Sequence, residues 1–120
     1  MTTQTTTFDL SALSRAITER DAASQLANYA DDAQVQIVDR DNPPSAPRIL
    51  QGKDAIGQWI EDVCARDMTH AVQNHVVADG GAAFTQSCRY PGGARVLCCT
   101  VLQIRDGQIS RQVAMQAWDE

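Results

Sequence analysis

The hydrophobic and polar positions divide the chain into a helical first part and a second part made of strands. Between residues 8 and 30, apolar side chains recur at the spacing of a helix. They are Leu10, Leu13, Ile17, Leu26 and Tyr29. The polar run at 19–21 interrupts this stripe. The pattern predicts two helices, over about 9–19 and 21–30, joined by a polar turn.

The next segment predicts a strand, a loop and a third helix. Residues 33–39 alternate between apolar and polar and are rich in β-branched side chains, which is typical of a strand. Three prolines between 40 and 48 predict an irregular loop, and 49–51 predict a short strand. A third helix begins near Gly52, and its apolar stripe has a period of 3.6 residues. The stripe consists of Ile56, Trp59, Ile60 and Val63.

From Met68 onward the pattern predicts four long strands, over 68–78, 82–90, 95–105 and 108–118. Each turn between them carries glycine, which is typical of an antiparallel meander. The order of elements predicts an α+β domain in which the helices pack on one face of a curved sheet, antiparallel or mixed. We expect a flexible polar tail over 1–8 and a single domain over 9–120.

Composition and charge narrow the classes of function. The 120 residues have a formal net charge of −5, and the basic residues form no run, which argues against nucleic acid and anionic membranes as partners. Apolar segments of the 18–20 residues that cross a bilayer are absent from the sequence, and the polar N-terminus does not resemble a signal peptide. We therefore expect a cytoplasmic protein. The four cysteines form no C-x-x-C pair, so the sequence predicts neither a metal site nor disulfides.

Three segments resemble the nuclear transport factor 2-like superfamily, and its SnoaL-like branch in particular. They are L-A-N-Y-A-D-D-A-Q-V at 26–35, Q-G-K-D-A-I at 51–56 and I-R-D-G-Q-I-S-R at 104–111. The resemblance implies a cystatin-like, cone-shaped α+β barrel, with the sheet wrapped around three helices and an apolar pocket at the wide end. It also implies a small hydrophobic or aromatic ligand, no cofactor, and a homodimer formed through the convex face of the sheet.

Two activities of this superfamily are disfavoured by the residues themselves. In the ketosteroid isomerases a tyrosine and two aspartic acids do the chemistry, and their positions fall near Leu13, Ile37 and Thr100. None of these side chains can serve as the tyrosine donor, the base or the carboxylic acid. The Asp-Arg-Asp set of the limonene epoxide hydrolases cannot be assembled around Arg111 and Asp119.

The two histidines, His70 and His75, lie on the same predicted strand. Because they are an odd number of residues apart, they face opposite sides of the sheet unless a bulge intervenes. His70 resembles the catalytic histidine of the scytalone dehydratases, which implies that it faces the pocket together with Val72, Asn74 and Val76. The alternative is a histidine that is merely hydrogen-bonded at a strand end.

Asp39 is the predicted partner of His70. Ile37 matches an inward-facing position of the superfamily, so Asp39 is expected at the pocket rim. A carboxylate there would raise the basicity of the imidazole and make the pair a general base. The alternative is a solvated charge at the end of a strand.

The other predicted pocket residues follow from strand alternation and from the resemblance. Strand alternation turns Phe84, Gln86, Leu102, Ala114 and Cys98 inward as well. The predicted substrate-binding set is Tyr29, Ile37, Trp59, Asn74, Cys88, Tyr90, Thr100, Gln112, Gln116 and Trp118. For a hairpin loop at 91–95, Cys88 faces Cys98 across the pocket wall. Both thiols are either small apolar lining or a reactive pair, and the sequence identifies no neighbouring cation that would lower a thiol pKa.

Three hypotheses for the function remain open at this point. The first is a cofactor-independent isomerase, dehydratase or cyclase that uses His70 on a small hydrophobic molecule. The second is a non-catalytic binder of such molecules. The third is a dimerisation module whose own side chains, among them Trp59, fill the pocket.

Overall fold

The structure, a computed structural model, describes residues 8–119, which form three helices and six strands. The predicted tail over 1–8 lies outside the described residues except for Phe8, which packs against the core. The helices are α1 (Leu10–Thr18), α2 (Ala22–Leu26) and α3 (Lys53–Ala65). The strands are β1 (Tyr29–Val38), β2 (Arg48–Gln51), β3 (Thr69–Ala78), β4 (Gly81–Arg89), β5 (Arg95–Arg105) and β6 (Gln108–Asp119).

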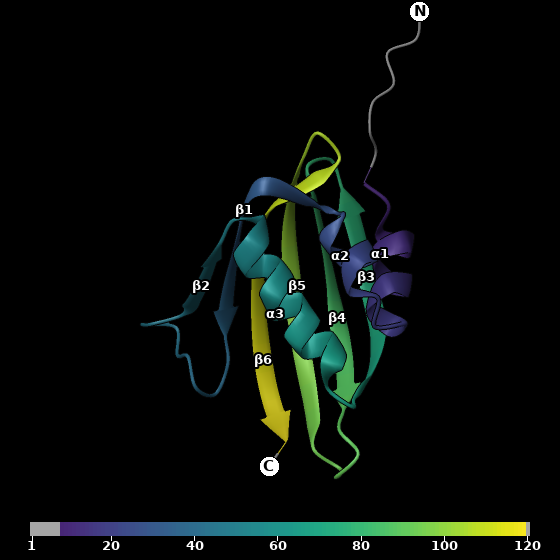
Figure 1. Cartoon of the computed structure of the whole chain (residues 1–120), viewed down its shortest axis with the longest axis vertical. Coiled ribbons are helices and arrows are strands. Elements are labelled where there is room, and N and C mark those ends of the chain that lie inside the picture. Colours follow the sequence, from purple (N-terminus) through teal and green to yellow (C-terminus); the bar gives the residue numbers. More distant parts are fainter. Residues whose placement is uncertain (1–7, 120) are drawn as a thin grey trace, which may run out of the picture.

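The strands form one mixed sheet in the order β2-β1-β6-β5-β4-β3. Among the strands of residues 8–119, only the β1–β6 pair is parallel, and the segment from β2 to β5 supplies the long crossover that a parallel pair requires. The predicted α+β class is confirmed, with a curved sheet that does not close. Figure 1 shows α3 crossing β5 and β6, with α1 and α2 beside it near β3. No helix within residues 8–119 is long and apolar enough to span a bilayer.

Local sequence explains where the first two helices begin and end. The Asp9 carboxylate caps α1 by accepting from the Ala12 N–H at 3.2 Å, and Asp21 caps α2 in the same way through Ser24. The prediction that the second helix runs to residue 30 is wrong. The Asn28 side chain bonds the last carbonyls of α2, and the chain then enters β1 at Tyr29.

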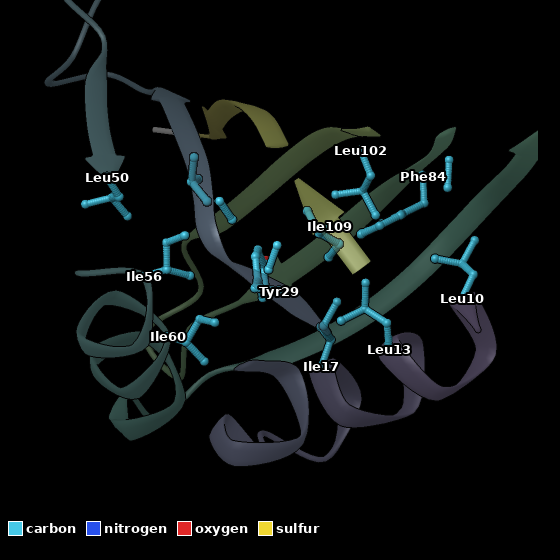
Figure 2. Packing of buried hydrophobic residues seen from close by; sticks show 14 of the residues in the cluster. Leu10, Leu13, Ile17, Tyr29, Leu50, Ile56, Ile60, Phe84, Leu102 and Ile109 are labelled. Atoms are coloured by element: carbon cyan, nitrogen blue, oxygen red, sulfur yellow. The ribbon is translucent and has the colours of Figure 1, made fainter. Parts of the chain in front are cut away.

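The core lies between the helices and one end of the sheet (Figure 2). The apolar stripe of α1 and that of α3 point toward strand residues of β4, β5 and β6. The labelled contributors are Leu10, Leu13, Ile17, Tyr29, Leu50, Ile56, Ile60, Phe84, Leu102 and Ile109. Burial of these apolar side chains, whose positions follow the sequence pattern, is the main contribution to the stability of the fold.

A bulge in β3 breaks the predicted alternation of that strand. The pairing with β4 shifts between Gln73 and Val76, and Asn74 adopts a φ of +59°. Asn74 is exposed, and Val76 is 62% exposed. The prediction that both side chains face the pocket is therefore wrong, because an extra residue rotates the strand beyond Gln73.

Candidate functional site

A cavity of about 100 Å³ lies under α3, beyond the apolar core, where the concave face of the sheet widens. Its volume is of the same order as the ~150 Å³ apolar cavity that can hold benzene, which corresponds to one ring. Apolar side chains form most of the wall, with a few polar groups among them. The lining includes Leu13, Ile17, Trp59, Ile60, Val63, Met68, His70, Phe84, Gln86, Cys88, Val96, Cys98, Thr100 and Ala114. Gln25, Tyr29, Arg66, Tyr90, Gln112, Gln116 and Trp118 complete it.

His70 lies on this wall near the start of β3 and is 8% exposed. Its Nδ1 atom is 3.1 Å from the Cys88 Sγ and 3.1 Å from the Gln86 Nε2. No hydrogen bond within residues 8–119 uses Nε2, and no buried side-chain nitrogen there is left without a partner. Nε2 is therefore not sealed within the protein, and because His70 lines the cavity, we expect this atom to reach a molecule inside it.

Cys88 connects His70 to a second thiol. The hydrogen bond that Cys98 donates lowers the pKa of the Cys88 thiol most, and His70 and Gln86 lower it further, against the effect of burial. The same hydrogen bond, together with burial, raises the pKa of Cys98. The sequence identified no cation near these thiols; the structure places His70 there.

The register of the β4–β5 hairpin also differs from the prediction. Arg89 pairs with Arg95, so Cys88 lies opposite Val96 and not opposite Cys98. The Tyr90 N–H donates to the Ala94 carbonyl, so residue 90 lies opposite residue 94, and the loop ends two residues earlier than the predicted loop at 91–95. The two thiols are diagonal neighbours on the same face of the sheet, and the pKa of each is shifted by the other.

Three polar groups line the opposite side of the cavity. The Tyr29 hydroxyl donates to the Gln112 Oε1, and both side chains are buried. Burial raises the pKa of Tyr29, so this phenol stays protonated at neutral pH. Thr100 is buried beside them. These groups give an otherwise apolar cavity the means to orient a carbonyl or hydroxyl group.

The mouth of the cavity is aromatic and opens into an outer groove. The rings of Tyr90 and Trp118 stack with centroids 5.9 Å apart, and the Trp118 indole N–H donates to the Gln116 Oε1 at 3.1 Å. Arg66 donates to the Tyr90 hydroxyl at 3.1 Å, which fixes the phenol at the entrance. Trp59 and Gln116 line both the cavity and the groove.

Two predicted residues lie in the groove and not on the cavity wall. Ile37 is 1% exposed, packs in the core and borders the groove. The Asp39 carboxylate accepts from the Asp41 N–H, the Asn42 N–H and the Asn42 side-chain amide, each at 2.9 Å. It caps its own turn, and no hydrogen bond joins it to His70 within residues 8–119.

The structure brings the other predicted site residues together, apart from Asn74 on the bulge. His70, Tyr29, Trp59, Cys88, Tyr90, Thr100, Gln112, Gln116 and Trp118 all line the cavity. The predicted site omitted two residues that contact its members, Gln86 and Arg66. Strand alternation predicts that Gln86 faces inward, so its position was predictable. Arg66 lies just beyond the end of α3, where helical periodicity no longer predicts which way a side chain points.

The residue types at this site define what it can do. The described residues hold no cluster of three potential metal ligands, and the described cavity wall carries no aspartate or glutamate. The acid–base group with open access is the imidazole of His70, and the nucleophilic atom beside it is the Cys88 sulfur. The arrangement supplies proton transfer and hydrogen bonds to one small molecule.

Solved structures share this fold of a curved mixed sheet with helices on one face. An NTF2-like protein of unknown function from Mesorhizobium loti aligns with a TM-score of 0.80 at 14% identity, covering 90% of this chain and 87% of that one. A candidate ketosteroid isomerase from Kribbella flavida aligns with a TM-score of 0.75 at 16% identity, covering 92% and 75%. A candidate polyketide cyclase from Sinorhizobium meliloti aligns with a TM-score of 0.66 at 21% identity, covering 88% and 91%.

Sequence comparison gives the family. No curated protein matches this chain. The family profile of the SnoaL-like domain matches residues 10–112, which is most of the chain. The curved mixed sheet, the helices on its concave side and the profile match lead to one conclusion: this chain belongs to the SnoaL-like domain family of the NTF2-like superfamily.

Proposed function

We propose that the chain binds a small, partly apolar cyclic molecule with one or two oxygens in the concave cavity and acts on it as a cofactor-independent isomerase, lyase or cyclase. His70 is the proposed acid–base residue. The observation that carries this proposal is the position of the ring: it is buried on the cavity wall, held through Nδ1 and open at Nε2. The names of the Kribbella and Sinorhizobium proteins support the class of reaction.

The chemistry follows from the polar groups on the two sides of the cavity. The Gln112 amide and the Thr100 hydroxyl donate to the oxygen of the ligand, and the Tyr29 hydroxyl holds Gln112 in place. His70 Nε2 takes or gives a proton on the opposite side. Cys88 and Gln86 hold the imidazole in orientation. Asp39 has no part in this mechanism because its carboxylate is used by its own turn.

Two histidines on one strand give a matched test. The probe is proton–deuterium exchange at the carbon next to the carbonyl of cyclohexanone and of larger cyclic ketones. General acid–base catalysis contributes roughly 10²- to 10⁴-fold, so we expect His70→Gln to lower the exchange rate by about 10²-fold or more. His75→Gln, at an exposed position of the same strand, serves as the control.

The results of this test separate the candidate functions. Equal rates for both variants would contradict the proposal. A second candidate is a non-catalytic binder, favoured by the absence of any carboxylate from the described cavity wall. It predicts that ketones bind, shifting the His70 ring signals in NMR spectra, without any exchange above the buffer rate.

We propose further that two copies pair through the convex face of the sheet, in the reducing setting of the cytoplasm. Large apolar side chains lie exposed there: Leu97 is 53% exposed, and Val101 and Met115 are each 44% exposed. They alternate with the inward Thr100 and Ala114, which fixes them on the outer side. Exposed contiguous apolar surface of this kind is typical of an interface. The same face would serve a dimerisation module.

Val101→Glu tests the convex face. It places a carboxylate near the centre of the proposed interface, and across a twofold axis it meets its own copy. We expect the variant to sediment as a monomer in analytical ultracentrifugation. Val77→Glu is the control, because Val77 is 60% exposed but pairs with the buried Ala82 and so faces the other way. A wild-type monomer, or equal behaviour of the two variants, would contradict this interface.

A further inference from the structure

We infer that Cys88 is a nucleophile that forms a reversible covalent bond with conjugated carbonyl compounds in the cavity, with His70 as its proton partner. The inference rests on the proposed small-molecule pocket and names a substrate class for it. It starts from two contacts: His70 Nδ1 lies 3.1 Å from the Cys88 Sγ, and the Gln86 amide nitrogen lies 3.4 Å from the same sulfur. Cys98, diagonal to Cys88 on the same face, lowers the pKa of Cys88 further.

These contacts stabilise a thiolate. A sulfur anion needs donors around it, and here an imidazole, an amide and a second thiol converge on Cys88. The lowered pKa of Cys88 agrees with this geometry. Cys88 is 2% exposed and lines the cavity, so a molecule reaches its sulfur by entering the cavity.

The groups around Cys88 favour one class of electrophile over another. Acyl transfer needs backbone N–H groups directed at a developing oxyanion. Around Cys88 the backbone belongs to β3, β4 and β5, whose N–H groups are used in the sheet. Conjugate addition needs only a donor to a carbonyl oxygen some ångströms from the sulfur, and Thr100, Gln112 and Tyr29 line the same cavity.

The step balances without a further reactant. The thiolate forms a bond to the β-carbon of the α,β-unsaturated carbonyl, and the electron pair of the double bond moves to the enolate. His70 gives its proton to the α-carbon, so the net result is addition of S–H across C=C. The reverse elimination returns the thiolate. Rotation about the former double bond before elimination gives the other geometric isomer, which is an isomerase reaction without cofactor.

The experiment compares the cysteines within one molecule. The wild-type chain is treated with 2-cyclohexenone at pH 6, and mass spectrometry of peptides measures the rate at each cysteine, with fragment ions separating Cys98 from Cys99. Cys99 is exposed and is the internal reference. A thiol of ordinary pKa is mostly protonated at this pH, so we expect Cys88 to react about tenfold faster than Cys99.

Three variants assign the effect. Cys88→Ser should remove the adduct at this site, and His70→Gln should slow its formation about tenfold because the imidazole no longer supports the thiolate. His75→Gln should leave the rate unchanged. The other titratable groups that line the cavity are Tyr29, Arg66, Tyr90 and Cys98, so the pH profile is measured with Cys98→Ala as well.

Each result bears on the inference. A Cys88 rate equal to or below that of Cys99, or an unchanged rate in His70→Gln, would overturn it. Saturated cyclohexanone separates this failure from failure of the proposed function. If cyclohexanone shifts the His70 ring signals while the enone leaves Cys88 unmodified, the covalent step is wrong, but the proposal that the cavity binds small molecules is retained. If neither compound has an effect, both are wrong.

Discussion

The two ends of the concave face use the same strands for different purposes. On β4, Ala82 packs in the core away from the cavity, and six residues later Cys88 contacts His70. On β5, read in the opposite direction, Leu102 is a core residue and Cys98 lines the cavity. The backbone hydrogen bonds continue unbroken between the two ends. The cavity therefore arises from a change of side-chain type along each strand, and not from a change of fold.

The packed end of the concave face contributes mainly to stability, and the cavity end contributes mainly to ligand chemistry. At the packed end the side chains are apolar and nearly without exposure, which is where burial contributes most of the stabilisation. At the cavity end, Thr100, Gln112 and His70 are buried polar groups that need partners. Mutations at the first end should mainly change the free energy of unfolding, and mutations at the second should mainly change ligand chemistry.

The largest expected effect is at the packed end. Leu102→Ala removes a side chain that is 1% exposed in the core, and such truncations cost about 2–5 kcal/mol because a cavity remains. Urea denaturation followed by circular dichroism measures this loss. Gln116→Ala at the cavity mouth is the matched control and should cost less than half as much. Equal losses would contradict the division between the two ends.

A pair of alanines sharpens the comparison. Ala33 on β1 is 0% exposed in the core, whereas Ala114 on β6 lines the cavity. Ala33→Leu overfills a packed region and should destabilise the fold by about 1–3 kcal/mol. Ala114→Leu projects into open space and should leave the free energy of unfolding nearly unchanged while blocking cyclohexanone binding. Calorimetry and an NMR titration check the two outcomes; the reverse order of stabilities would refute the assignment of the cavity.

The smallest effect concerns Tyr29, which belongs to both the core and the cavity wall. Tyr29→Phe leaves the buried Gln112 oxygen without its donor and should cost about 1–2 kcal/mol. Burial raises the pKa of Tyr29, so its stabilising contribution is complete below the usual tyrosine pKa of about 10 and is lost as the pH rises further.

The pH dependence provides the control for Tyr29. The unfolding free energy of the wild-type chain should fall more steeply above pH ~10 than that of Tyr29→Phe, because the variant lacks this titration. Denaturation curves at a series of pH values measure both slopes. Parallel curves would mean that the phenol is not the buried donor that it is in this structure.

Much of the fold and part of the site were predictable from sequence. The α+β order, the apolar stripes and the inward positions on β4, β5 and β6 follow from periodicity, so residues such as Gln112 and Trp118 are where alternation places them. The bulge at Asn74, the two-residue shift in the register of the β4–β5 hairpin and the turn capped by Asp39 were not predictable. Each depends on a local hydrogen bond or an inserted residue that periodicity does not encode.

The pairing of His70 with Cys88 shows the same limit in the site. The register of β3 against β4 puts these two residues directly opposite each other. Strand alternation and the family resemblance predict that each of them lines the pocket but not that they touch, because cross-strand register depends on loop lengths and bulges. The predicted partner of His70 was instead Asp39, which the structure places in the turn after β1. The register of β3 against β4 therefore gives His70 a thiol partner, Cys88, in place of the predicted carboxylate.

The bulge at Asn74 bears on whether copies of the protein aggregate through the edge of the sheet. β3 ends the strand order, so its outer side presents a row of unpaired peptide groups that another chain's strand can join. The extra residue between Gln73 and Val76 interrupts that row and twists the border away from flatness. A β3 edge without the bulge could pair with the same edge of another copy and lead to fibre-like growth. We expect the bulge to oppose such pairing.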